Sequence, residues 1–161
     1  MSGNVGVVVV FGVEVEADSD YAVNLIRELL LENEHVPRDI FNNFNVYYDY
    51  YVMGQGTDPE TPDGHYDLYS YFQDAITGAY SRTTTIKCFR QACCLSEDWK
   101  KKLVVGIKLA HVHNVWISPQ GIDFPSITET MVESVKLQLS EHGFSTDTKT
   151  FFILDDCISC T

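Results

Sequence analysis

The chain lacks the long apolar and basic segments that mark membrane and secreted proteins. A membrane-spanning helix needs roughly 20 apolar residues in a row, whereas the most apolar stretch of this sequence begins at Val5 and is interrupted at Glu14. No Lys or Arg precedes that stretch, so it does not resemble a secretory signal. We therefore expect an intracellular, cytoplasmic protein that makes no contact with membranes.

Positive charge is also scarce. The sequence contains 11 Lys and Arg residues against 23 Asp and Glu residues, which gives a formal net charge of −12 at pH 7. A protein with this charge repels the phosphates of nucleic acid, so direct nucleic-acid binding is not expected. The acidic balance is typical of a solvated surface. Where the charge serves recognition, it favours a basic protein partner, or a role as an acidic mimic of nucleic acid.

The sequence has no motif with a specific catalytic meaning. Gly54 and Gly56 lack the third glycine and the following helix that Rossmann and P-loop sites require, and no serine lies in a G-x-S-x-G turn. Asp155 and Asp156 are neighbours, so on a strand they would point to opposite faces and could not work as a pair. The five cysteines are an odd number in a chain without a signal, which indicates reduced thiols.

What the sequence does contain is one supersecondary pattern, used twice. In each half, a β-prone apolar segment is followed by an amphipathic helix and then by a second β-prone segment. The segments are residues 5–15, 20–33 and 46–53 in the first half and residues 103–112, 126–142 and 150–158 in the second half. Two strand–helix–strand units of this kind favour a single sheet with two helices packed on one face.

This pattern predicts one α+β domain over residues 1–161. We expect a ferredoxin-like two-layer sandwich in which βαβ units 5–53 and 103–158 flank a central insertion at residues 54–102. The strands at 5–15 and 103–112 are the most apolar, so we place them at the centre of the sheet. The alternative is a mixed α/β sheet of about five or six strands, to which the insertion adds one or two edge strands.

Residue spacing locates the helices and their starts. Ser126 and Glu129 have the spacing of a capping box, and Asp18 or Ser19 can cap the helix at 20–33. In the insertion, residues 67–79 form a further helical stripe and residues 83–89 are β-prone. Gly12 in the first strand has no side chain, which would let a helix or another backbone approach closely.

Residues 46–53 are unusually rich in tyrosine. Their high β-propensity predicts a strand, and four rings belong to it, namely Tyr47, Tyr48, Tyr50 and Tyr51. Tyrosine suits a half-exposed surface and is enriched at protein interfaces. We interpret the segment either as a partly covered edge strand or as a subunit interface. A homo-oligomer would then form through this strand or through another exposed edge of the sheet.

Two short motifs carry residue types that bind metals. His111 and His113 form an H-x-H pair, and Cys157 and Cys160 form a C-x-x-C pair. Zinc uses these ligands in sets of four. In the expected fold, however, the two pairs lie on strands separated by the first strand, roughly 10 Å apart. The odd positions of the strand at 103–112 are apolar as far as Leu109, and alternation would place His111 on that same face.

The sequence favours a non-catalytic protein that acts by self-association and protein–protein interaction, with no resident cofactor. The first alternative is a metal-dependent enzyme or small-molecule-binding protein that uses His111, His113 and Cys157, with zinc as the metal. The second alternative is the acidic nucleic-acid mimic, which would need carboxylates spaced along one surface.

Overall fold

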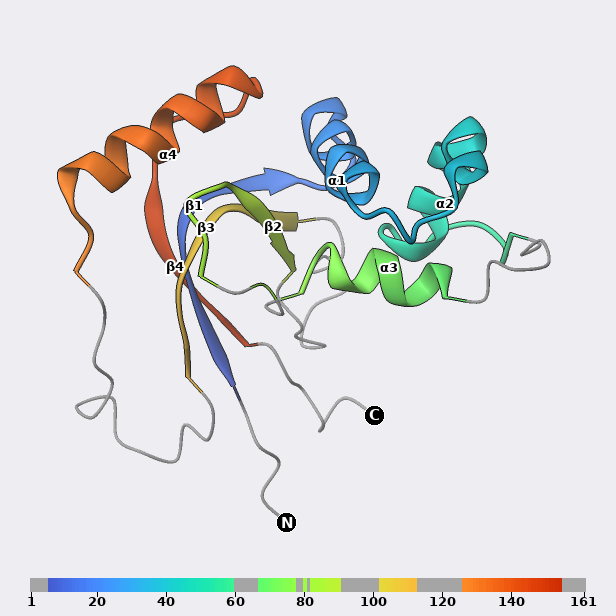
Figure 1. Ribbon diagram of the computed structural model, residues 1–161, viewed down its shortest axis with the longest axis horizontal. Coiled ribbons are helices and arrows are strands. Elements are labelled where there is room, and N and C mark those ends of the chain that lie inside the picture. Colours follow the sequence, from blue (N-terminus) through green and yellow to red (C-terminus); the bar gives the residue numbers. More distant parts are fainter. Residues whose placement is uncertain are drawn as a thin grey trace, which may run out of the picture.

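The residues that the structure describes combine four α-helices with a single sheet (Figure 1). The structure is a computed structural model, and it describes residues 6–59, 67–77, 80, 82–90, 102–112 and 126–154. In chain order, the described elements are β1 (Val7–Glu16), α1 (Asp20–Glu32), the 3-10 helix η1 (Arg38–Asn43), α2 (Phe44–Tyr51), α3 (Leu68–Asp74), β2 (Lys87–Arg90), β3 (Lys102–Val112), α4 (Glu129–Glu141) and β4 (Lys149–Leu154).

The described strands form a four-stranded antiparallel sheet in the order β2-β3-β1-β4. This confirms the α+β class, and it confirms that the two most apolar strands, β1 and β3, are neighbours at the centre. Because β3 and β4 both pair antiparallel with β1, they run in the same direction on either side of it, joined through α4. The alternative of five or six strands is wrong for the described residues, whose sheet is neither mixed nor that large.

The tyrosine-rich segment is a helix, so the prediction of a strand at 46–53 is wrong. Phe44, Tyr47, Tyr48 and Tyr51 recur at helical spacing, and the first three of these rings are buried in α2. Burying one aromatic stripe against the core outweighs the β-propensity of the individual residues. The strand that pairs with β3 comes instead from the insertion, where β2 occupies the end of the β-prone stretch at 83–89.

A β-bulge lies between the two central strands. Val9 pairs with Ala110 and Val10 pairs with Lys108, so Leu109 is an extra residue on β3. One extra residue reverses the alternation of faces beyond it. Leu109 therefore still packs with the core under the helices, whereas His111 lies opposite Val8 on the other face of the sheet. The expectation that His111 continues the apolar odd face is wrong for this reason.

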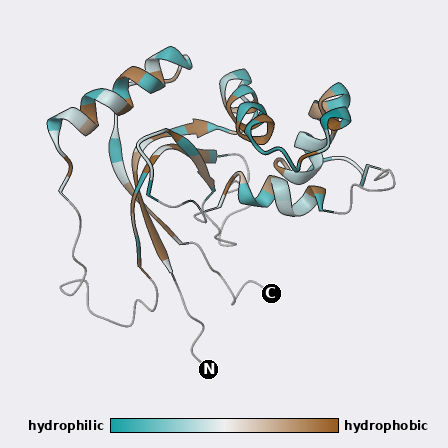
Figure 2. Ribbon diagram, viewed as in Figure 1, coloured by the Kyte–Doolittle hydropathy of each residue, from teal (hydrophilic) through white to brown (hydrophobic). Residues whose placement is uncertain are grey.

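The main core lies between the sheet and the helices. It joins one face of β1 and β3 to the buried stripes of α1 and α4, with Leu25 and Ile26 from α1 and Val135 and Leu139 from α4. Figure 2 shows how strongly hydrophobic residues concentrate along the central strands. The predicted packing of two helices on one face is confirmed, and α2 and α3 extend the same core beyond α1.

The opposite face of the sheet carries a smaller apolar cluster. Its buried members come from all four strands, namely Val8, Val10, Phe89, Val104 and Ile153. Tyr80 packs on this cluster, with its ring nearly perpendicular to that of Phe89 at a centroid distance of 5.8 Å. Lys108 is the charged residue buried on this side, with 7% of its surface exposed, opposite Val10.

Two glycines let the central strands approach closely. Gly12 pairs directly with Gly106. A Cβ at Gly12 would lie 2.0 Å from the carbonyl oxygen of Val105, and one at Gly106 would lie 2.1 Å from that of Phe11. The expectation that Gly12 admits a neighbouring backbone is therefore confirmed, and β3 is that backbone.

The helix starts follow local hydrogen bonding. The hydroxyl of Ser19 accepts a hydrogen bond from the Ala22 amide at 3.2 Å, as an N-cap should. At α4 the cap is Thr128, which accepts from the Met131 amide at 3.2 Å, so the predicted start at Ser126 is two residues early. No helix among the described residues has the length and apolarity needed to cross a bilayer.

Candidate functional site

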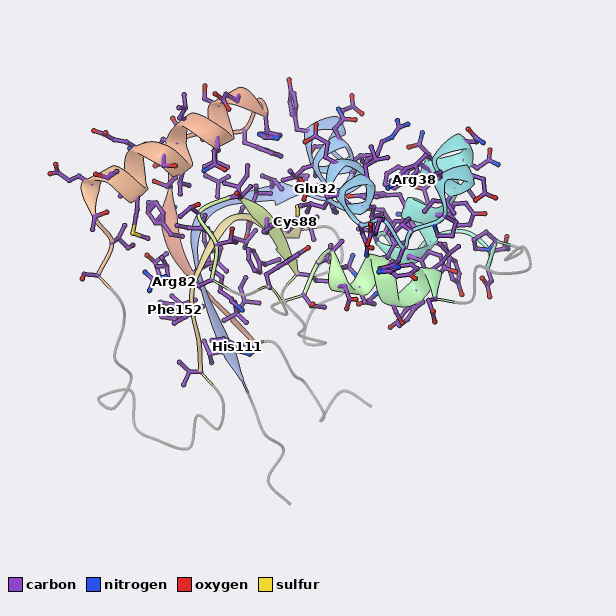
Figure 3. The ribbon with its side chains drawn as sticks, in the orientation of Figure 1. Glu32, Arg38, Arg82, Cys88, His111 and Phe152 are labelled. Atoms are coloured by element: carbon purple, nitrogen blue, oxygen red, sulfur yellow. The ribbon has the colours of Figure 1, made fainter. Side chains whose placement is uncertain are left out.

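The predicted metal ligands are only partly covered by the structure. His111 lies half-buried near the end of β3, and Figure 3 labels it on the sheet. His113, Cys157 and Cys160 lie outside the described residues. No group of three or more His, Cys, Asp or Glu side chains within the described ranges could hold a metal ion. The zinc hypothesis therefore stays a prediction, and it now requires ligands on the face opposite α1 and α4.

The four predicted interface tyrosines have different environments in α2. Tyr47 and Tyr48 are buried inside the protomer, whereas Tyr50 and Tyr51 are half-buried. The rings stack within the molecule, since Tyr51 lies 5.3 Å from Phe72 of α3 between ring centroids. The interface hypothesis stays a prediction, and only the outer rings of this segment are available to a partner.

Tyr48 anchors α2 to the end of β1. Its hydroxyl donates a hydrogen bond to the Ala17 carbonyl at 2.5 Å, and both residues are buried. Burial is the main reason that the pKa of Tyr48 lies well above the ordinary value of 10. The phenol therefore remains protonated and keeps its donor role at neutral pH.

Arg90 ties the ends of two helices to β2. Its guanidinium donates to the carbonyl of Val52, which caps the C-terminus of α2, and its amide donates to the Ile76 carbonyl just after α3 at 2.8 Å. A cation at the C-terminus of a helix stabilises the helix, because that end of the helix dipole is negative. Burial lowers the pKa of Arg90 to about 10, so the group is still charged at neutral pH.

An aromatic surface forms where α2 packs on α3. We call it the tyrosine surface and define it as Val46, Tyr50, Tyr51 and Tyr69. Tyr69 is 61% exposed and Val46 is 53% exposed. The ring of Tyr51 lies 5.2 Å from Tyr50 and 6.1 Å from Tyr69 between centroids, which makes the aromatic part continuous. Aromatic groups of this kind are typical of protein interfaces.

The chain around the tyrosine surface is acidic. Residues 39–81 contain seven Asp and Glu residues, no Lys or Arg, and eight of the nine tyrosines of the sequence. The described acids of this range are all exposed, namely Asp39, Asp49, Asp58, Asp67 and Asp74. Carboxylates beside open aromatic faces attract Arg and Lys side chains, both by charge and by cation–π contact.

The two outer edges of the sheet differ. At the β2 edge, the amide of Ile86 donates to the Gln138 side chain of α4 at 3.0 Å, and Arg90 pairs with the Ile76 carbonyl. The other edge is β4, which pairs with β1 alone among the described strands. Phe152 on β4 is 57% exposed and is labelled in Figure 3. This edge is thus both apolar and at the boundary of the described sheet.

A cavity of about 220 Å³ opens between α1, α3 and β2. Leu29, Leu30 and Ala75 form its apolar lining, and Tyr71 and Tyr80 contribute aromatic rings. This cavity was not expected from the sequence, because its walls come from three elements with no shared motif.

Charged groups surround the same cavity. Glu32 and Asp74 contribute carboxylates, and Lys87 contributes an ammonium group whose Nζ lies 3.5 Å from a Glu32 carboxylate oxygen. Glu32 is labelled in Figure 3, where it marks the α1 side. Cys88, the neighbour of Lys87, is fully buried, and burial raises the pKa of its thiol to about 12. The thiol is therefore protonated near neutral pH and does not act as a nucleophile there.

Comparison with known proteins adds no relative. No protein-family model matches the chain, and neither the search of curated proteins nor the search of solved structures finds a similar protein.

Proposed function

We propose that this protein is non-catalytic and acts by self-association and protein–protein interaction inside the cell. The observation that carries the proposal is the apolar edge strand β4 with its exposed ring at Phe152. Among the described strands, β4 pairs on one side only. An antiparallel strand at the edge of a sheet is a template for another strand, and a second copy of the same chain is the partner always present. We therefore propose that the homo-oligomer forms through the edge strand β4 and not through the tyrosine-rich segment, which is a helix.

Symmetry restricts how two β4 strands can pair. In an antiparallel pair, residues that lie opposite each other share a face of the sheet. A twofold axis perpendicular to the sheet therefore brings together positions of the same face, and the axis can pass through Phe152. The exposed ring of Phe152 then meets the ring of Phe152 of the second copy. Such cross-strand aromatic pairs contribute up to about 1 kcal/mol each.

Light scattering during size-exclusion chromatography tests this assembly. We expect a mass near twice the 18.2 kDa of the chain. Phe152→Lys should give a monomer, because a charge on an edge strand blocks pairing. Leu137→Lys is the matched control, since Leu137 is 61% exposed on α4 and lies outside the edge. A monomeric parent protein at high concentration, or an intact dimer of Phe152→Lys, would contradict the proposal.

The partner protein that we propose is basic and binds at the tyrosine surface. Support comes from the exposed rings of that surface and from the acidic chain around it, which has no Lys or Arg over residues 39–81. Tyr69→Ala should weaken binding of an Arg-rich peptide, whereas Tyr21→Ala should not, although Tyr21 is 54% exposed on α1. Undiminished binding by Tyr69→Ala would show that the peptide recognises charge alone and would contradict the proposal.

For the fold, we propose the ferredoxin-like arrangement. The strand order, with β1 and β3 at the centre and β4 and β2 outside, supports it, as does the β3–α4–β4 unit. In this description, η1, α2 and α3 are additions between α1 and β2. They carry both the tyrosine surface and one wall of the cavity, so the additions supply the proposed surface for a basic partner, whereas the sheet supplies the β4 edge.

A further inference from the structure

The cavity between α1, α3 and β2 lies at the negative ends of two helices. α1 ends at Glu32 and α3 ends at Asp74, and neither helix has a basic residue in its last turn. The C-terminus of a helix carries partial negative charge, so an acid there is unfavourable and a cation is favourable. Both helices thus carry an acid at the end where an acid is unfavourable. Two such acids at one cavity indicate that the cavity accommodates a positive charge.

The protein already holds one ammonium group at this position. Nζ of Lys87 lies 3.5 Å from the Glu32 carboxylate and 5.5 Å from the centroid of the Tyr80 ring. Only 16% of the Lys87 side chain is exposed. The cavity walls thus bind a primary ammonium through a carboxylate and an aromatic face. Asp74, the second carboxylate, forms no ion pair with a described residue.

A buried oxygen in the same wall also has unused hydrogen-bonding capacity. The hydroxyl of Tyr80 is enclosed and has no hydrogen-bond partner among the described residues. The pKa of Tyr80 lies well above its ordinary value, mainly because of burial, with smaller contributions from Cys88 and from the carboxylates of Asp74 and Glu32. The phenol is therefore neutral and its oxygen can accept a hydrogen bond. The phenol therefore adds no negative charge to the cavity, and its ring is the part of Tyr80 that an ammonium group contacts.

We propose that this cavity binds an alkylammonium group. The charged head would pair with Asp74 and lie against the aromatic ring of Tyr80, as the Lys87 ammonium does, and the alkyl chain would lie on Leu29 and Ala75. The apolar and aromatic walls suit an organic cation better than a metal ion, and the described residues offer no set of three metal-binding side chains. The group can belong to a free alkylamine or to a Lys side chain of another protein, because both present the same chemistry.

Titration of the isotope-labelled full chain with 1,5-diaminopentane, followed by amide chemical shifts, tests the site. We expect saturable shifts at the ends of α1 and α3 and in β2, and no such shifts with pentanol, which has the same alkyl length and no charge. Asp74→Asn should weaken binding about fivefold, the upper range for a solvent-exposed ion pair. Asp49→Asn is the matched control, because it removes an exposed acid of α2 outside the cavity.

Two further measurements complete the test. Tyr80→Leu removes the aromatic ring of the cavity wall and should also weaken binding while the far-ultraviolet circular dichroism is unchanged. A lysine derivative blocked at both backbone ends distinguishes the sources. Tighter binding than the diamine assigns the cavity to a protein Lys side chain, and weaker binding assigns it to a free amine. Absence of saturable shifts with either compound, or equal weakening by Asp49→Asn and Asp74→Asn, would overturn the proposal without affecting the β4 assembly.

Discussion

The hydrogen bond from Tyr48 to Ala17 gives a quantitative test of how the tyrosine segment folds. The change is Tyr48→Phe, which deletes one oxygen and keeps the ring. In the structure, this oxygen lies 2.5 Å from the Ala17 carbonyl, Tyr48 is 2% exposed and Ala17 is fully buried. Water cannot reach the carbonyl once the hydroxyl is gone, so the variant loses the bond and leaves a buried acceptor unsatisfied.

The free energy of unfolding should fall by about 2 kcal/mol. The variant loses the net stabilisation of the hydrogen bond, and it also pays the desolvation penalty of a buried acceptor without a donor. In a domain of this size, that corresponds to a fall in melting temperature of roughly 4–8 °C. Urea unfolding followed by far-ultraviolet circular dichroism measures the free energy of unfolding, and a thermal scan measures the melting temperature. The slope of free energy against urea should not change, since both proteins expose the same surface on unfolding.

Tyr47→Phe is the matched control. Tyr47 is one residue away on the same helix and is also buried, but its hydroxyl makes no hydrogen bond with a described residue. This variant should stay within about 0.5 kcal/mol of the parent protein. If Tyr48→Phe were as stable as Tyr47→Phe, the anchoring of α2 to the end of β1 would be wrong.

Two further predictions concern the sheet. Gly106→Ala should destabilise the protein by about 3 kcal/mol or more, because the new Cβ meets the Phe11 backbone and not a movable side chain. Urea unfolding measures this change. A variant as stable as the parent protein would contradict the close approach of β1 and β3. For Cys88, the folded thiol has a pKa of about 12 against an ordinary value of 9, so the unfolded chain loses its proton first as the pH rises. The free energy of unfolding should therefore fall between pH 9 and pH 12 by up to about 1.4 kcal/mol per pH unit from this group. The fall should be smaller in Cys88→Ala, and an identical pH dependence in both proteins would refute the assignment.

Much of the fold could be predicted from residue patterns within short segments of the chain. The apolar stripe of α1 and the strongly apolar sequences of β1 and β3 are local properties, and each element formed where the sequence predicted it. Placing β1 and β3 at the centre also needed only their hydrophobicity, because a central strand is covered on both faces. The acidic character of residues 39–81 was likewise visible in the sequence.

The errors arose where burial by distant residues decides the outcome. Residues 44–51 combine a β-prone composition with a helical spacing of aromatic rings. The helix is favoured by distant contacts, namely those of Tyr51 with Phe72 of α3 and of Tyr48 with Ala17. The bulge at Leu109 has no local signature, so the reversal of the face that carries His111 could not be predicted. The cavity combines α1, α3 and β2, which are far apart in the sequence.

The sequence by itself determined that this is an acidic α+β protein with two apolar strands at the centre of one sheet, because hydrophobic periodicity and charge are written residue by residue. Only the tertiary structure decided that residues 44–51 form a helix, that β4 is the outer apolar strand of the described sheet, and that two helix ends with acidic residues meet beside Lys87. These features depend on which surfaces are buried together, and that choice is a property of the whole chain, since local preferences of about 1 kcal/mol are smaller than the free energy of burying a large aromatic side chain.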